Sequence, residues 1–274
     1  MKNAIGQTES SGSENQAVRK FEWRRETIRY FSEGRGPTVV LLHGFGGNAQ
    51  NWVLQRRHLA ETHRVLTLDL PGHGGSTGRA IDFADYWRVV EAMLDDAGED
   101  HATMCGLAAG ARVGVALAVQ RPERVRAVII VNSFFHLNAE DRAQREELYD
   151  LLPKEGGPTL WADRLLSLMA VADHPVIARG FHRSLVQIDP HHIRRVFLEQ
   201  LALDQRPDLE QLICPVLVIR GARDALIGDY MLEDTVGRLD RVEVVVLETG
   251  HLPYLEAPAD FDRTVLDFLG RHHF

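Results

Sequence analysis

Six short, largely apolar runs constrain the fold of this chain more than any other feature of its sequence. An apolar run of this length is typical of a strand that is covered on both faces, as the strands of a parallel sheet are. The segments between most of the runs carry apolar residues at helical spacing. This alternation predicts an α/β fold with a mostly parallel central sheet flanked by helices. The predicted strands are residues 38–42, 65–70, 101–105, 127–131, 216–220 and 242–247.

The predicted helices complete this pattern. They occupy the intervals between strands and follow the last one, where apolar residues fall on one helical face. A further stretch near the start of the chain, residues 21–31, alternates as a strand does. The predicted helices are residues 52–59, 82–97, 109–120 and 259–269.

One long interruption divides the pattern. Helical spacing broken by prolines fills residues 134–206, and no strand-like run occurs there, which predicts an inserted helical cap. Residues 19–133 and 207–274 then form the core as one domain. The polar start of the chain, rich in Ser, Glu and Asn, predicts a flexible tail over residues 1–18.

Composition limits the kinds of partner. The formal net charge is −8 at pH 7, so the chain lacks the basic surface that nucleic acid or an anionic membrane requires. This balance favours a small-molecule substrate and leaves a homodimer open. The two cysteines, Cys105 and Cys214, imply no disulfide framework, and no apolar run has the length of a membrane span or a signal-peptide core. We therefore expect a soluble, cytoplasmic protein.

The segment at residues 104–112, MCGLAAGAR, lies where a predicted strand gives way to a predicted helix. Gly106 and Gly110 stand at the outer positions of the pattern Gly-x-Ser-x-Gly, which places a nucleophilic side chain on a sharp turn. The central position is Ala108, whose methyl group cannot attack a carbonyl or accept a proton. The sequence therefore predicts a nucleophile elbow that lacks its nucleophile.

Glycine-rich or charged turns follow the other predicted strands, at the edge where open α/β sheets bind ligands. With the elbow, four of these segments resemble the α/β-hydrolase superfamily, in particular its compact, cap-bearing bacterial esterases, lactonases, carbon–carbon bond hydrolases and related lyases. The resemblance covers nearly the whole chain from about residue 21. The four segments are HGFGG at 43–47, DLPGHGGS at 69–76, GARD at 221–224 and GHLPYLEAP at 250–258.

The resemblance implies a chemical role for particular residues. Asp224, after the penultimate predicted strand, corresponds to the acid and His251, after the last one, to the base, while Ala108 holds the nucleophile position. The carboxylate would fix the imidazole tautomer and stabilise the cation formed when His251 takes a proton. The backbone amides of Phe45 and Ala109 would form the oxyanion hole.

The resemblance also implies substrate contacts. Arg112 lies four residues beyond Ala108 and so falls on the same side of the following helix. Family members that act on carboxylate-bearing substrates carry an arginine at this offset, which implies that Arg112 grips a substrate carboxylate, with Gly44 and Phe45 also at the substrate. The alternative for Arg112 is an ion pair between core and cap.

Other histidines and hydroxyls are expected to be structural. His73 and Ser76 fit a bracing role in their glycine-rich loop better than a chemical one. His191 and His192 have no third partner at ligand spacing, so the sequence predicts neither a metal site nor a cofactor.

Three interpretations of Ala108 are open at the level of sequence. In the first, which we favour, the native residue is serine and this chain is an inactivated variant that holds its substrate. The native form would cleave an ester, lactone, amide or activated carbon–carbon bond of a small metabolite, with or without a carboxylate, by a Ser-His-Asp mechanism. In the second, the alanine is natural and His251 with Asp224 acts alone as a general base, as in a lyase, a cyclase or a cofactor-free oxygenase. In the third, the chain is a non-catalytic receptor.

Overall fold

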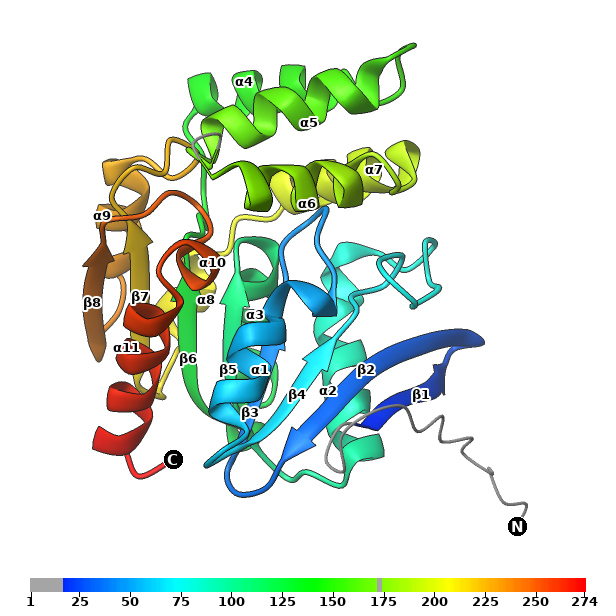
Figure 1. Ribbon diagram of the computed structural model, residues 1–274. Coiled ribbons are helices and arrows are strands. Elements are labelled where there is room, and N and C mark those ends of the chain that lie inside the picture. Colours follow the sequence, from blue (N-terminus) through cyan, green and yellow to red (C-terminus); the bar gives the residue numbers. More distant parts are fainter. Residues whose placement is uncertain (1–16, 172–173) are drawn as a thin grey trace.

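The computed structural model describes residues 17–171 and 174–274. An eight-stranded sheet forms its centre, in the order β1-β2-β4-β3-β5-β6-β7-β8 (Figure 1). Strands β3 to β8 are parallel, whereas β2 runs antiparallel to both β1 and β4. The predicted α/β architecture with a mostly parallel sheet is confirmed. The strands are β1 (Ala17–Trp23), β2 (Glu26–Gly34), β3 (Thr38–Leu42), β4 (Arg64–Leu68), β5 (Ala102–Leu107), β6 (Val125–Val131), β7 (Val216–Gly221) and β8 (Val242–Leu247).

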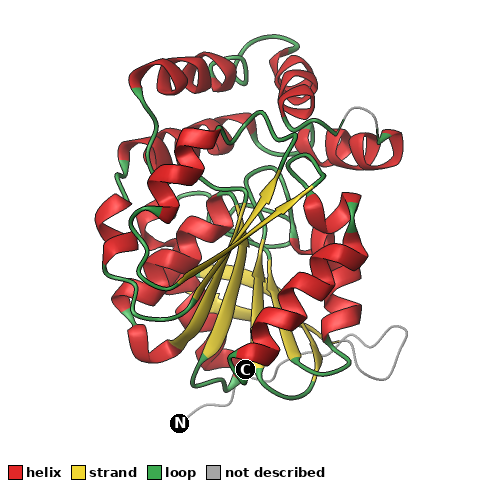
Figure 2. Ribbon diagram, turned by 90° about the vertical axis from the view of Figure 1, so that its left-hand side faces the viewer, coloured by secondary structure: helices red, strands yellow, loops and turns green. Residues whose placement is uncertain are grey.

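Helices cover both faces of the sheet, as Figure 2 shows. Within residues 17–171 and 174–274, none of them is long and apolar enough to span a membrane. Short 3-10 helices, η1 (Ala49–Trp52), η2 (Phe83–Asp85) and η3 (Pro122–Arg124), precede α1, α2 and β6. The α-helices are α1 (Val53–Leu59), α2 (Tyr86–Ala97), α3 (Ala109–Gln120), α4 (Ala139–Tyr149), α5 (Gly157–Leu168), α6 (Pro175–Leu185), α7 (Pro190–Ala202), α8 (Arg206–Glu210), α9 (Asp229–Val236), α10 (Pro253–Glu256) and α11 (Pro258–Arg271).

Alternate side chains of the central strands enter two apolar cores, one on each face of the sheet. In β3, Val39 and Leu41 belong to the core that contains α1 and α11. Val40 and Leu42, the intervening residues, belong to the core that contains α2 and α3. Because both faces of β3 are buried, all its side chains must be apolar or paired, which explains the uninterrupted run in the sequence.

The first strands differ from the prediction. Residues 21–31 fall in two strands, β1 and β2, which are joined by a tight turn. Arg24 and Arg25 occupy that turn with φ of 49° and 71°, a conformation that glycine or asparagine usually signals. The Arg24 guanidinium lies 4.4 Å from the centroid of the Trp23 ring and donates to Asp85 at 2.8 Å. The turn is thus supported by side-chain contacts that its own sequence does not reveal.

The predicted tail falls largely outside the described residues, since residues 1–16 are not among them. Ala17 and Val18 are the first residues of β1, where they pair with Ser32 and Phe31 of β2. The sheet therefore begins within the stretch that composition assigns to the tail.

Helices α4 to α8 lie between β6 and β7, in the interval where the sequence predicts a cap. In Figure 1, α4 to α7 lie above the ends of the parallel strands, whereas α8 lies lower, against α3. The Tyr149 ring of α4 stacks on the Phe197 ring of α7, with centroids 3.4 Å apart. We refer to α4–α7 as the inserted helices.

Candidate active site

The glycine-rich turns meet at one point along the edge of the sheet. The chain passes from β3 to β4 on one side and later to β5 on the other, so β3 and β5 are neighbours at a topological switch point. Ligands bind at such points because the loops diverge there and leave a crevice. Gly44 lies in the loop after β3, and a Cβ added to it would lie 3.4 Å from the Cβ of Ala108 in the loop after β5. The two loops are therefore in contact.

The elbow has the strained backbone that is typical of a nucleophile turn. Ala108 has φ 48° and ψ −112°, which costs a non-glycine residue on the order of 1–3 kcal/mol. A Cβ at Gly110 would overlap the Leu42 carbonyl, and one at Gly106 would overlap the backbone amide of Ala111. Gly106 thus lets β5 approach α3, and Gly110 lets α3 approach the end of β3, around a turn that has alanine at its apex.

His251 and Asp224 form a buried pair beside the elbow. Nδ1 of His251 lies 2.7 Å from Oδ2 of Asp224, and both side chains are almost fully buried. The other Asp224 oxygen accepts the backbone amide of Leu226 at 2.9 Å. Among the described residues Nε2 of His251 has no hydrogen-bond partner, and the ring lines the same pocket as Ala108. The pair can therefore accept or release a proton at Nε2.

Backbone hydrogen bonds connect the end of α5 to the loops that carry His251 and Asp224. The backbone amide of His251 donates to the Met169 carbonyl at 2.8 Å. The backbone amide of Ala225, next to Asp224, donates to the Leu168 carbonyl at 3.0 Å. The inserted helices therefore contact both loops through backbone hydrogen bonds.

The backbone amides of Phe45 and Ala109 are not used inside the fold. Neither has an acceptor within the part of the chain that the structure describes, and both residues line the pocket. Ala109 is the first residue of α3, where amides lack intrahelical acceptors and the helix dipole favours negative charge. The two amides are available to a negatively charged oxygen.

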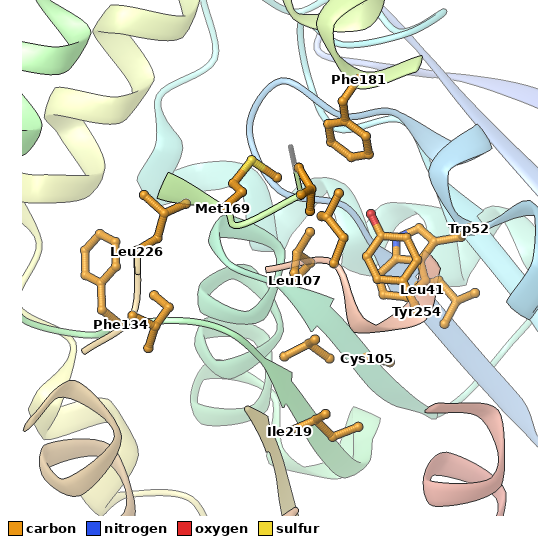
Figure 3. Close-up of a cluster of buried hydrophobic side chains, with 14 of the residues drawn as sticks. Leu41, Trp52, Cys105, Leu107, Phe134, Met169, Phe181, Ile219, Leu226 and Tyr254 are labelled. Carbon is orange, nitrogen blue, oxygen red and sulfur yellow. The ribbon is translucent and has the colours of Figure 1, made fainter. Parts of the chain in front are cut away.

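A mostly apolar pocket connects these groups to the inserted helices. In Figure 3, the Phe181 side chain points from the inserted helices toward Leu107 and Tyr254 of the core. Met169 and Leu226 line the same pocket. A pocket of this composition suits a small molecule with an apolar body. The residues that line it are Gly44, Phe45, Gly47, Asn51, Leu107, Ala108, Ala109, Phe134, Arg145, Leu148, Tyr149, Leu165, Met169, Phe181, Phe197, Gln200, Leu226, Ile227, His251 and Tyr254.

The structure places Arg112 away from this pocket. Its Nε donates to Oε1 of Gln205 at 2.5 Å and its Nη2 to the Leu203 carbonyl at 2.6 Å, while the guanidinium lies 5.6 Å from the centroid of the Phe134 ring. Burial lowers the pKa of Arg112 to about 9, which leaves it charged at neutral pH. Arg112 thus binds the segment around Leu203 and Gln205, which leads from the inserted helices back to the core. It is not positioned to grip a substrate in the pocket, and the alternative ion pair is also not found among the described residues.

The inserted helices place polar side chains in the pocket that sequence reasoning missed. Arg145 and Tyr149 come from α4, and Gln200 comes from α7. Arg145 and Tyr149 are four residues apart, a spacing that predicts a shared helical face but not the partner of that face. Only the packing of the helices over the strand ends brings these side chains to the elbow.

The predicted bracing role of His73 and Ser76 is confirmed. His73 Nδ1 lies 3.0 Å from the Pro71 carbonyl, and Ser76 Oγ donates to the Asp69 carbonyl at 2.7 Å. Ser76 Oγ also accepts the backbone amide of Arg29 at 2.9 Å. Both side chains are engaged within their own loop and its neighbouring strand.

Three buried histidines pack together behind the loops of the pocket. The His73 ring centroid lies 5.1 Å from that of His43 and 5.5 Å from that of His192. His43 accepts the Leu70 amide at Nε2, 3.0 Å away, and donates from Nδ1 to the Gly44 carbonyl at 2.8 Å, so it is neutral. Burial lowers the pKa of all three histidines from 6.5, and that of His73 lies well below this value.

These shifts predict a loss of stability in mild acid. Because the folded pKa values of His43, His73 and His192 lie below 6.5, the unfolded chain binds more protons as the pH falls. Their contribution is complete above about pH 6.5 and is lost as the pH falls through the folded values; His58, whose pKa Asp262 raises, acts in the opposite sense. We expect the free energy of unfolding in urea to fall as the pH is lowered from 6.5 to 5.5.

A variant isolates the histidine contribution to this slope. His73→Leu should weaken the pH dependence between 6.5 and 5.5, because one buried group that must stay neutral is gone. If the free energy of unfolding of the parent chain stays constant or rises as the pH falls to 5.5, the lowered pKa values of the three histidines are contradicted.

Metal-ligand geometry is not found in the described ranges, where no group of three or more His, Cys, Asp or Glu side chains is arranged to hold an ion. The His191 and His192 pair begins α7 instead. Their backbone amides donate to Oδ1 of Asp189 at 2.9 and 3.1 Å, which caps the helix.

Comparison with known proteins identifies the class to which this fold and site belong. The model of the alpha/beta hydrolase family matches residues 39–264. The chain belongs to this family, and the α/β-hydrolase fold that its motifs predict is confirmed.

Particular relatives are similar over most of the chain. The dihydrolipoyllysine-residue acetyltransferase component of the acetoin cleaving system of Pseudomonas putida is 29% identical over 270 residues, which cover 93% of this chain and 70% of that protein. The 3-oxoadipate enol-lactonase 2 of Acinetobacter baylyi is 27% identical over 245 residues, which cover 86% of this chain and 89% of that protein. The crystal structure of the enol-lactonase from Burkholderia xenovorans has a TM-score of 0.82 at 24% identity and covers 92% of this chain and 99% of that one.

Proposed function

We propose that the pocket binds a small ester or lactone and that its polar groups are built for acyl transfer, with an amide or an activated carbon–carbon bond as related substrates. One observation carries the proposal: the strained elbow, the His251–Asp224 pair and two unused backbone amides all meet at one apolar pocket. The similarity to an enol-lactonase supports the choice of ester and lactone substrates.

The proposed chemistry begins with a serine at position 108. Its Oγ attacks the substrate carbonyl carbon while Nε2 of His251 takes the hydroxyl proton. Asp224 keeps the other proton on Nδ1 and stabilises the imidazolium, and the amides of Phe45 and Ala109 donate to the oxygen that becomes negative. His251 then protonates the leaving group. Water, deprotonated by His251, attacks the acyl group and releases the acid product and the serine.

Ala108 removes the first of these steps and leaves the others. The methyl group has no proton to give to His251 and no lone pair with which to attack, so no acyl intermediate forms. Loss of the serine in a comparable enzyme of another fold costs about a millionfold in turnover. In this proposal the present chain binds its substrate and does not turn it over by the covalent route.

A second candidate function is general-base catalysis without a nucleophile. It is favoured by the intact His251–Asp224 geometry, in which the His251 ring lines the pocket although Ala108 supplies no hydroxyl at the elbow. His251 would then deprotonate the substrate or a water molecule directly, as in a lyase, a cyclase or a cofactor-free oxygenase.

The test is a paired assay of this chain and its Ala108→Ser variant. Both are treated with p-nitrophenyl acetate and butyrate and with a fluorophosphonate probe, after circular dichroism shows that both are folded. We expect only the variant to hydrolyse the esters and to become labelled, because only it has a hydroxyl at the apex of the elbow. As a control, Ser76 already supplies an unactivated serine, and the parent chain should remain unlabelled.

Failure of the variant to react would overturn the acyl-transfer proposal. If both chains are folded and neither is labelled, the general-base and receptor functions become the working hypotheses. If the parent chain hydrolyses the esters and His251→Ala abolishes this activity, the result supports general-base catalysis without a nucleophile.

A further inference from the structure

Among the described residues that line the pocket, the guanidinium of Arg145 is the one fixed charge, and none of them is an aspartate or glutamate. Arg145 is only 9% exposed, and among the described residues no carboxylate lies within 4 Å of it. Its hydrogen bond is from Nη2 to the Leu226 carbonyl, at 2.6 Å. A buried cation with no anionic partner is unfavourable unless another negative group completes it.

The acidic side chain that stands at ion-pair spacing from Arg145 on the same helix is engaged elsewhere. Asp141 lies one turn before Arg145 in α4, which is a favourable spacing for an ion pair. Instead, Asp141 accepts the Tyr230 hydroxyl and the Asn138 side-chain amide. The other donors of the Arg145 guanidinium therefore have no acceptor among residues 17–171 and 174–274.

The packing of α4 against α7 places Gln200 at the level of Arg145. Two contacts show that helices α4 and α7 run antiparallel. The Tyr149 ring stacks on Phe197, and Arg142, nearer the start of α4, donates to the carbonyl of Leu201, nearer the end of α7. Arg145 is one turn before Tyr149, and Gln200 is one turn after Phe197. This register brings Arg145 and Gln200 to the same level of the helix pair.

Within the part of the chain that the structure describes, the Gln200 side chain also has no hydrogen-bond partner. It is 2% exposed and lines the pocket, and its Oε1 is enclosed without a hydrogen-bond partner. Rotation about the terminal torsion lets its amide present either the oxygen or the NH2 group to a ligand. A buried, unsatisfied amide beside an uncompensated guanidinium marks a polar position in an otherwise apolar pocket.

We propose that Arg145 and Gln200 form a carboxylate-binding subsite and that the substrate is a small monoanion with an apolar body. The carboxylate takes the free donors of Arg145 and the NH2 group of Gln200. A planar, singly charged carboxylate matches one guanidinium and one amide, whereas a phosphate dianion would retain a negative charge without a donor. The position of the scissile carbonyl at Ala108 rests on the proposed function; the anion subsite does not.

The experiment measures binding to the full chain with matched probes. Monomethyl esters of the straight-chain diacids from succinate to suberate each carry one carboxylate, and the corresponding dimethyl esters are neutral and of nearly equal size. By titration calorimetry we expect the best monoester to bind at least about tenfold tighter than its diester. Arg145→Met should weaken the monoester by about 10- to 100-fold and change the diester by less than about twofold.

Arg142→Met is the matched control. Arg142 lies on the same helix and also donates to a backbone carbonyl, that of Leu201, but it does not line the pocket. This variant should keep the preference for the monoester. Gln200→Met should reduce the preference less than Arg145→Met does, because it removes a neutral donor.

The outcomes separate the subsite from the proposed reaction. Equal weakening of monoester and diester by Arg145→Met, or no preference for any monoester in the series, overturns the subsite, because Arg145 then only supports the Leu226 carbonyl. Fluorophosphonate labelling of the Ala108→Ser chain without an anion preference would leave the reaction standing and the subsite excluded. An anion preference that Arg145→Met abolishes, in a chain that Ala108→Ser does not activate, would give the opposite result.

Discussion

Asp224→Asn is expected to lower kcat for p-nitrophenyl acetate by about 10⁴-fold when it is introduced into the Ala108→Ser chain. An asparagine can donate its NH2 group to Nδ1 of His251, which then becomes an acceptor, so the ring proton moves to Nε2. In that tautomer Nε2 cannot take the proton of the attacking hydroxyl. The assay is steady-state hydrolysis at saturating ester, with the single Ala108→Ser variant as the reference.

A second Asp–His contact, between a buried aspartate and an exposed histidine, supplies the control. Oδ2 of Asp262 lies 2.8 Å from Nδ1 of His58, and this pair lies outside the pocket lining. Asp262→Asn in the Ala108→Ser chain should change kcat by less than about threefold and should lower stability instead. A comparable loss of kcat in both variants, or a loss below tenfold for Asp224→Asn, would remove Asp224 from the proposed mechanism.

Gly110→Ala is expected to destabilise the protein by on the order of 3 kcal/mol. Alanine is ordinarily favoured over glycine inside a helix by about 1 kcal/mol. At Gly110 the added Cβ meets the backbone carbonyl of Leu42 at the end of β3, which cannot move without displacing the loop that follows. The measurement is the urea midpoint at constant m value, read beside the parent chain.

The same substitution at Gly180 should have the opposite sign. Gly180 is in α6, and a Cβ there meets nothing within 4 Å. Gly180→Ala should stabilise the protein by about 0.5–1 kcal/mol. Equal effects at the two positions would mean that helix propensity, and not the close approach of α3 to β3, decides the result.

The apolar runs locate both β3, which is buried on both faces, and β8, an edge strand with partly exposed residues. Residues 38–42 and 242–247 coincide with β3 and β8, and residues 109–120 coincide with α3. In β3 each apolar side chain meets a core on its own face, so composition alone marks the strand. The turn at Arg24 and Arg25 is different, because its positive φ values are supported by Trp23 and Asp85 and not by a turn residue.

The sequence does not predict which polar side chains line the pocket. The sequence predicts that Arg112 lies in α3 one turn after the elbow. The orientation of its guanidinium, however, is set by hydrogen bonds to Leu203 and Gln205, about ninety residues later in the chain. Arg145 and Gln200 are separated by a whole helix pair, and their proximity follows from the register of α4 on α7. No local spacing contains that register, since it depends on the packing of Tyr149 against other helices.

The two backbone hydrogen bonds at the end of α5 define where this molecule can be divided. Leu168 and Met169 belong to the insertion by position, yet their carbonyls accept the amides of Ala225 and His251. A chimera that replaces the whole insertion would also replace the supports of the Asp224 and His251 loops. Grafts intended to change substrate preference should therefore retain residues 168–169 and exchange only the helices on either side of them.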